Sequence, residues 1–228
     1  MDYVYVCKDG ENEELRYSIR SVVANSNVSS LWVVGGKPDW YTGNYIPVNK
    51  PGTKMDKVVN NLKAIIDSTE ISEEFVLMND DFFILDKIDS VPDLHGGSLM
   101  EKINLYLDIV PRSSYTRHLH KTYNWIKRRG VKEPLDYELH VPMKMTKTNL
   151  KKVIDYPVLW RSAYGNLFDV GGIEIEDVKV YKRGPLLYKS FDYKSKLSTF
   201  LSSNDDAFDM LYEEILKDRF TSKTQFEK

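Results

Sequence analysis

The sequence has only one cysteine in its 228 residues, Cys7, so no disulfide can form within the chain. A lone cysteine is typical of a reducing compartment, and the apolar stretch around Cys7 favours a small core residue over a nucleophile. No apolar run is long enough to cross a bilayer, and the first residues lack the basic and apolar regions of a signal peptide. These absences predict a cytoplasmic protein without a membrane span.

The sequence also lacks an excess of charge of either sign, because the formal net charge is −2. No global basic field therefore favours nucleic acid or membrane as a partner. The motifs of several enzyme classes are missing as well: there is no Walker loop, no dinucleotide-binding glycine signature, no zinc-type cysteine cluster and no nucleophile elbow. Charged residues make up 29% and hydrophobic residues 42%, which indicates a soluble globular protein that we expect to be a single domain over 1–228.

What the sequence does have is an alternation of strands and helices in its first 85 residues. Apolar runs at 3–7, 31–34 and 75–78 predict strands, and a short strand is expected at 45–48. Helical periodicity fills the stretches after Gly10 and between 55 and 66. Short joints between these elements indicate parallel βαβ units, so we predict a doubly wound α/β fold with a mostly parallel sheet.

The most informative segment is 74–85, EFVLMNDDFFIL. A strand buried on both faces ends there in Asn79, Asp80 and Asp81, and a second apolar run follows at once. Burying adjacent carboxylates is costly unless a positive group meets them. Ligands bind at the carboxyl ends of strands in such sheets, and hard divalent cations prefer oxygen ligands. We therefore favour a metal or phosphate site over a solvated Asx-turn.

The second half of the chain is predicted to be richer in helices. We expect helices at 98–110 and 113–129, a strand at 138–143 that ends in a proline segment, and a β-hairpin over 178–188 around Lys182-Arg183-Gly184. A capping-box pattern from Ser203 to Asp206 predicts the start of the last helix, and the tail after Phe220 is expected to fray.

A basic and aromatic segment coincides with the second of these helices. It contains Arg112, Arg117, His118, His120, Lys121, Lys127, Arg128 and Arg129 between Tyr115, Tyr123 and Trp125. Such a run is usually a solvated helix face with its aromatic side chains turned inward, and we prefer that interpretation. The alternative is a surface that binds the backbone and bases of a nucleic acid, or an anionic acceptor.

Several phrases of the sequence resemble hallmarks of the Stealth family, sugar-phosphate transferases of capsule synthesis that are related to the lysosomal-enzyme N-acetylglucosamine phosphotransferase. Residues 9–22, DGENEELRYSIRSV, are similar to the family pattern N-x-E-L-R-Y-S-L-R-S-V, and 31–40, LWVVGGKPDW, to its following strand and G-x-x-P-x-W. Residues 75–83 match F-I-Y-L-N-D-D-F-F, 3–10 its opening Y-T-W-V-D-G, and 140–143 its H-x-P segment. The family's F-N-S-H segment has no counterpart at 53–56.

The resemblance implies a Rossmann-like nucleotide-sugar transferase of the GT-A type, with 1–90 as the donor-binding half and 91–228 as the acceptor-side half. It implies a nucleotide-diphosphate sugar donor, with a uridine-diphosphate sugar favoured, and Mg²⁺ or Mn²⁺ as cofactor. The acceptor would be a hydroxyl of a glycan, as in polysaccharide biosynthesis. Asp80 and Asp81 are expected to hold the metal, with Asn79 orienting them and Asp9 contacting donor or metal.

The remaining candidate site residues are three arginines, which could bind phosphate, and a histidine, which could transfer a proton. Arg16, Arg20 and Arg161 are candidates for phosphate, because a guanidinium fork matches two oxygens at once. The alternative for Arg16 and Arg20 is ion pairs with helix neighbours such as Glu13. His140 is a candidate general base or acid, and Asp81 and Arg161 complete the expected catalytic set.

Residue types leave three questions open. Attack at the anomeric carbon gives a glycosyltransferase and attack at phosphorus a phosphotransferase, and both need the same metal and arginines. The acceptor could instead be a modified base in phage DNA. A third interpretation is a non-catalytic sugar- or nucleotide-binding module.

Overall fold

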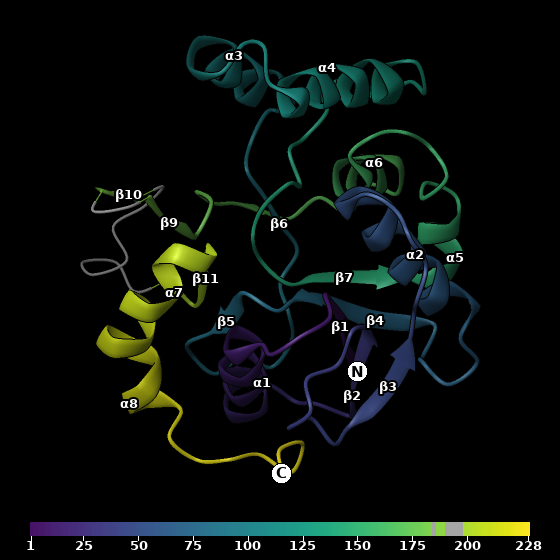
Figure 1. The fold of residues 1–228 in the computed structure, drawn as a ribbon. Coiled ribbons are helices and arrows are strands. Elements are labelled where there is room, and N and C mark those ends of the chain that lie inside the picture. Colours follow the sequence, from purple (N-terminus) through teal and green to yellow (C-terminus); the bar gives the residue numbers. More distant parts are fainter. Residues whose placement is uncertain (184–185, 190–197) are drawn as a thin grey trace. The chain divides into compact units, whose positions relative to one another are not determined.

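The computed structural model describes residues 1–183, 186–189 and 198–228, which form two compact units. The first unit contains Met1–Val91, His140–Lys147 and Val178–Lys228, and the second contains Pro92–Leu139 and Thr148–Asp177. Each unit is an independent cluster of contacts and is described by itself (Figure 1). None of the helices in the described part of the chain combines the length and apolar character of a membrane span.

The first unit contains a five-stranded sheet in the order β3-β2-β1-β4-β7 (Figure 1). The strands are β1 (Asp2–Cys7), β2 (Ser30–Gly35), β3 (Asn44–Pro47), β4 (Glu74–Asn79) and β7 (Met143–Thr146). All neighbours are parallel except β4 and β7, so the predicted α/β fold with a mostly parallel sheet is confirmed. Because β2 and β4 lie on opposite sides of β1, the winding reverses between β1 and β4, and a crevice is expected at their carboxyl ends.

Two helices connect the parallel strands, and both begin where the sequence supplies a cap. Helix α1 (Glu13–Asn25) starts after Asn12, whose side chain accepts a hydrogen bond from the Leu15 amide. Helix α2 (Lys54–Asp67) starts with a reciprocal capping box between Thr53 and Asp56. Helix α1 packs mainly on β5 (Phe82–Ile84), and α2 packs on β1 and β2.

A second sheet in the first unit has the order β10-β9-β11-β5. The antiparallel pair β9 (Lys179–Arg183) and β10 (Leu186–Lys189) confirms the predicted hairpin, although its turn residue Gly184 lies outside the described residues. Strand β11 (Phe200–Ser203) joins β9 to β5 and was not predicted. The predicted capping box at 203–206 is wrong, because Ser203 ends this strand and Asn204 precedes helix α7 (Asp205–Leu211).

The C-terminal segment folds back onto the first unit. After α7 the chain continues through a π-helical turn (Tyr212–Leu216) and α8 (Lys217–Arg219). The Thr42 amide then donates to the Phe226 carbonyl at 2.9 Å, and the Lys228 amide donates to the Trp40 carbonyl at 2.9 Å. The prediction that the tail frays after Phe220 is wrong, because these backbone bonds fix it to the connection between β2 and β3.

The second unit is mostly helical. It contains α3 (Leu99–Ile109), α4 (Ser114–Lys127), most of α5 (Lys147–Lys151) and α6 (Trp160–Leu167), with a small parallel pair of β6 (Leu94–His95) and β8 (Ile173–Glu174). Leucine and isoleucine side chains of α3 and α4 share one apolar core with Leu159. The first two helices confirm the predictions at 98–110 and 113–129.

The strand expected at 138–143 is wrong for all but its last residue. Strand β7 begins only at Met143 and extends to Thr146. Before it, the Glu138 amide donates to an Asp136 carboxylate oxygen at 3.0 Å, and the Glu138 carbonyl accepts from Lys102 at 3.1 Å. These side-chain contacts satisfy backbone groups that a strand ladder would otherwise use, and Pro142 has no amide to contribute.

Candidate functional site

Asp80 lies in the turn that follows β4, at the carboxyl end of the parallel sheet. One of its oxygens accepts a hydrogen bond from Asn12 Nδ2 at 2.6 Å, while the Asn12 Oδ1 atom caps α1. Burial raises the pKa of Asp80 and the negative charge of Asp81 raises it further, while the Asn12 hydrogen bond and the positive charge of Lys8 partly oppose both. Asp80 is therefore a carboxylate whose charge is poorly balanced by its surroundings.

Asp81, the next residue, is buried and has a cationic partner. Lys179 Nζ of β9 donates to Asp81 Oδ2 at 2.8 Å, and Ser202 Oγ of β11 lies 3.2 Å from the same oxygen. The two neighbouring carboxylates thus have different environments: Lys179 neutralises Asp81, and a neutral amide meets Asp80.

A third carboxylate, Glu14, belongs to the same group. Burial raises the pKa of Glu14 to about 7, with further contributions from the negative charges of Asp80, Asp81 and Asp205. Ser203 Oγ donates to Glu14 Oε1 at 3.2 Å and opposes this shift. A carboxyl that titrates near neutrality can accept or release a proton at working pH.

The raised pKa of Glu14 predicts a pH-dependent effect of its removal. The folded state binds the Glu14 proton more tightly than the unfolded state, so this residue lowers stability increasingly as the pH rises from the usual glutamate range through about 7. We expect Glu14→Gln to raise the melting temperature at about pH 8 and to change it little at about pH 4. The exposed Glu11→Gln is the control, and an equal shift at both pH values for Glu14→Gln contradicts the prediction.

The carboxylates at this edge of the sheet fit Mg²⁺ or Mn²⁺ in one binding mode only. Among residues 1–183, 186–189 and 198–228, no group of three or more His, Cys, Asp and Glu side chains is arranged to hold a metal ion. A hard cation that serves a phosphorylated substrate usually takes only one or two carboxylates and completes its shell with waters and phosphate oxygens. The poorly balanced Asp80 beside Asp81 fits this mode, and the Lys179 partner of Asp81 is compatible with it only if Asp81 uses its other oxygen or releases the lysine.

Asp9 and Asn79 lie at the same edge of the sheet. Asn79 ends β4 beside Val6 of β1, and Asp9 is exposed in the loop that follows β1. A Cβ atom on Gly36 would come within 2.4 Å of the Asp9 backbone, so this glycine is needed for the close approach of the two loops. Asp9 and Asn79 therefore lie at the carboxyl edge of the sheet, as the sequence predicted. Their roles remain predictions.

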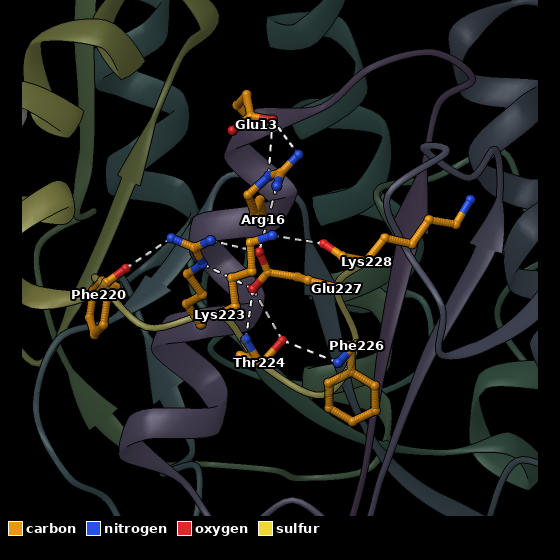
Figure 2. Close-up of polar contacts among 9 residues, drawn as sticks. Glu13, Arg16, Phe220, Lys223, Thr224, Phe226, Glu227 and Lys228 are labelled. Atoms are coloured by element: carbon orange, nitrogen blue, oxygen red, sulfur yellow. Dashed lines mark hydrogen bonds and ion pairs between the residues drawn. The ribbon is translucent and has the colours of Figure 1, made fainter.

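Arg16 and Arg20 contact the C-terminal tail rather than the carboxylates at the sheet edge, and Figure 2 shows Arg16 between Glu13 and Glu227. Arg20 donates through Nε and Nη2 to the two carboxylate oxygens of Glu227, at 2.9 and 2.6 Å, and through Nη1 to the Phe220 carbonyl at 3.1 Å. Arg16 pairs with Glu13 at 2.9 Å, and its guanidinium lies 4.5 Å from the centre of the Trp40 ring. These contacts favour the ion-pair alternative, and a role in phosphate binding remains an untested prediction that they do not support.

His140 lies in the first unit, close to the surroundings of Asp81. Its ring is edge-on to Phe82, which follows Asp81, with 6.4 Å between ring centres, and to Tyr181 with 6.3 Å. The Lys179 ammonium that binds Asp81 lies 5.7 Å from the Tyr181 ring centre. A chain of contacts thus connects His140 to Asp81.

Arg161 belongs to the second unit and is buried there. Its Nε donates to the Tyr137 carbonyl at 3.1 Å, burial lowers its pKa, and the nearby Glu138 carboxylate opposes that shift. Glu138 in turn accepts from the Ser162 amide at 2.8 Å. These contacts describe a buried charged group within the second unit, and the catalytic role of Arg161 stays a prediction.

Sequence reasoning missed several polar residues that surround the carboxylates: Asn12, Glu14, Lys179, Ser202 and Ser203. Asn12 carried a usable signal, because an asparagine just before a helical period is a typical N-cap. Glu14 stands in the family-like segment 9–22, which also marked it. Lys179, Ser202 and Ser203 carried no signal, since β9 and β11 reach the site from more than 90 residues away along the chain.

No family model matches the sequence, and no curated protein is similar to it. Among the solved structures that it resembles is that of the galactosyltransferase LgtC in complex with donor and acceptor sugar analogues. The two chains are 15% identical, and the match covers 60% of this chain and 68% of that chain with a TM-score of 0.34. A similarity at this level carries no argument about activity. The α/β architecture follows from the strand order and pairing described above.

Proposed function

We propose that the chain is a transferase that moves a sugar, or a sugar 1-phosphate, from a nucleotide-diphosphate sugar to a hydroxyl of a glycan-type acceptor. The observation that carries this proposal is the group of Asp80, Asp81 and Glu14 near the carboxyl ends of β1 and β4. Open α/β sheets bind their ligands where the winding reverses. The resemblance of residues 3–40 and 75–83 to Stealth transferases supplies the substrate class.

In this proposal Asp80 and Asp81 would hold Mg²⁺ or Mn²⁺, which supplies positive charge to the diphosphate of the donor when bound. Lys179 is a further cation at this place, bound to Asp81. Asn12 keeps Asp80 against the N-terminus of α1 and so fixes the direction of one carboxylate. Glu14 and His140 are the candidates to accept the proton of the acceptor hydroxyl.

The reacting bond decides between the two transfer reactions. If the acceptor oxygen attacks the anomeric carbon, the bond from that carbon to the diphosphate oxygen breaks and a nucleoside diphosphate leaves. If it attacks the phosphorus next to the sugar, the bond inside the diphosphate breaks, a nucleoside monophosphate leaves and the product is a phosphodiester. Phosphorus NMR of a reaction mixture distinguishes these products, and a non-catalytic binding module consumes no donor.

The direct test is a thermal-shift screen of nucleotide sugars with and without Mg²⁺ or Mn²⁺. We expect a uridine-diphosphate sugar together with the metal to raise the melting temperature, because a ligand that binds only the folded state stabilises it by mass action, by about 2.7 kcal/mol at a hundredfold excess over Kd. Asp80→Asn should lose this shift, and Asp67→Asn, an exposed acid at the end of α2, should keep it. A screen with no shift for any donor, or a shift that survives Asp80→Asn, contradicts the proposal.

A further inference from the structure

Helix α4 has an uncompensated basic face although the whole chain is slightly acidic. Residues 110–132 contain no Asp or Glu and seven Arg and Lys: Arg112, Arg117, Lys121, Lys127, Arg128, Arg129 and Lys132. Helical spacing puts Arg117, Lys121 and Arg128 on one exposed stripe. Within the described residues, none of the seven forms a salt bridge with an acidic side chain. Arg117 and Lys127 donate instead to the backbone carbonyls of Arg112 and Lys132, at 2.8 and 2.7 Å.

Exposed apolar side chains directly precede this basic segment in the chain. At the C-terminal end of α3, Leu105 is 55% exposed, Ile109 65% and Val110 41%. Leu105 and Ile109 are one turn apart and therefore lie side by side. The two helices pack against each other in the second unit (Figure 1). The Tyr106 and Tyr115 rings lie 5.1 Å apart, and Thr116 Oγ1 donates to the Val110 carbonyl at 2.9 Å.

The aromatic residues of α4 are not free to stack on bases. Tyr115, Tyr123 and Trp125 are partly buried against the apolar core that α3 and α4 share. The Arg129 guanidinium covers the Trp125 ring at 3.4 Å from its centre. A single-stranded nucleic acid would need such rings as stacking platforms and would gain little from exposed aliphatic side chains. The surface thus offers aliphatic groups and cations but no free aromatic faces.

We propose that α3 and α4 form a docking surface for an anionic lipid membrane, a function beyond the proposed transfer reaction. The basic stripe is attracted by acidic headgroups, and Leu105, Ile109 and Val110 enter the boundary between headgroups and acyl chains. Both contributions are needed, because aliphatic burial without charge or charge without burial gives weak, reversible binding. The helices lie on the surface and do not cross the bilayer.

Co-sedimentation with vesicles tests this proposal. The vesicles contain phosphatidylcholine alone or phosphatidylcholine with phosphatidylglycerol, and the expected result is binding to the second kind only. Arg117→Gln/Lys121→Gln/Arg128→Gln should weaken binding roughly a hundredfold, since each basic residue near an anionic surface contributes a factor of about five. The matched control, Lys50→Gln/Lys54→Gln/Lys57→Gln, removes as many exposed charges from the first unit and should bind as the unaltered chain does.

A second variant tests the apolar contribution. Leu105→Ser/Ile109→Ser should also reduce binding, and the binding that remains should disappear in high salt because only screened electrostatic attraction is left. All substituted side chains are exposed, and circular dichroism verifies that the variants fold. The proposal is overturned if the unaltered chain does not sediment with anionic vesicles, if the control loses as much binding as the α4 variant, or if duplex DNA is retained in a gel shift while vesicles are not.

Discussion

Asp80→Asn is expected to stabilise the folded protein and to abolish its transferase activity. Ionised Asp80 is costly in the folded state, because burial and the charge of Asp81 raise its pKa and the Asn12 amide only partly compensates. An asparagine removes the charge and can still accept the Asn12 hydrogen bond. Removing an electrostatic group that acts on developing charge typically lowers kcat by a factor of about 100 to 1000, and we expect a loss of that size.

Two measurements check this expectation: the melting temperature near neutral pH and the rate of donor consumption. Asp81→Asn is the matched comparison. It should also lose activity, but it replaces the buried carboxylate that accepts the Lys179 hydrogen bond by a neutral amide, loses that charge-assisted contact and should therefore lower the melting temperature. If Asp80→Asn keeps its activity, or loses both activity and stability, Asp80 is a structural residue and the proposed metal site is wrong.

The opposite effects on stability and activity are the physical signature of a functional site. Asp80 is half-buried, and the cation that acts on it, Lys8, is exposed and gives only a small compensation, so the ionised carboxylate is costly unless a ligand supplies further positive charge. The burial of the Asp81 carboxylate is explained by its ion pair with Lys179. Asp80 has no such explanation within the contacts of the described residues, and this asymmetry between two adjacent side chains is the strongest reason to place ligand binding at the end of β4.

The sequence could predict this part of the fold because its signals are local. Strands β1, β2 and β4 are buried almost throughout, which appears in the sequence as uninterrupted apolar runs. Each run is followed by a polar loop, so the carboxyl edge with Asp9, Asn79 and the acidic pair could be located without coordinates. The order of the strands was not predicted and comes from the structure.

Strand β11 shows why the rest could not be predicted. Its four residues are all buried, yet two of them are serines, and their hydroxyl groups are satisfied by Asp81 and Glu14 from distant parts of the chain. Without knowledge of those partners, Ser203 followed by Asp206 is indistinguishable from a helix start. The same holds for Lys179, whose partner Asp81 lies 98 residues earlier in the sequence.

The family-like phrases also include residues whose contacts are with the tail. Arg16, Arg20 and Trp40 all lie in segments that resemble the Stealth pattern, and all three meet residues of the C-terminal segment or each other. A short-range pattern could not reveal this, because Glu227 is 207 residues away from Arg20. Similarity of short sequence segments therefore indicates which residues are important. It does not distinguish residues that contact a substrate from residues that stabilise the fold.

Glu227→Ala is expected to cause a large loss of stability. The Glu227 side chain is fully buried and that of Arg20 is 9% exposed, and two parallel hydrogen bonds join them. Truncation leaves a buried guanidinium whose remaining hydrogen-bond acceptor within the described part of the chain is the Phe220 carbonyl. Removing one member of a buried, hydrogen-bonded ion pair costs about 3 to 5 kcal/mol, and urea denaturation measures that loss.

The matched control for this variant is Glu13→Ala, which removes the exposed partner of Arg16 and should cost less than about 1 kcal/mol.

The pH dependence gives an independent check. Burial alone would raise the pKa of Glu227, but the hydrogen bonds from Arg20 and the Thr224 amide outweigh it and lower the pKa. A depressed pKa stabilises the folded state above the usual glutamate range and loses that contribution as the pH falls through the lowered value. The difference between the unaltered chain and Glu227→Ala should therefore shrink in acid, and a difference that is constant with pH, or no larger than that of Glu13→Ala, would show that the tail does not depend on this ion pair.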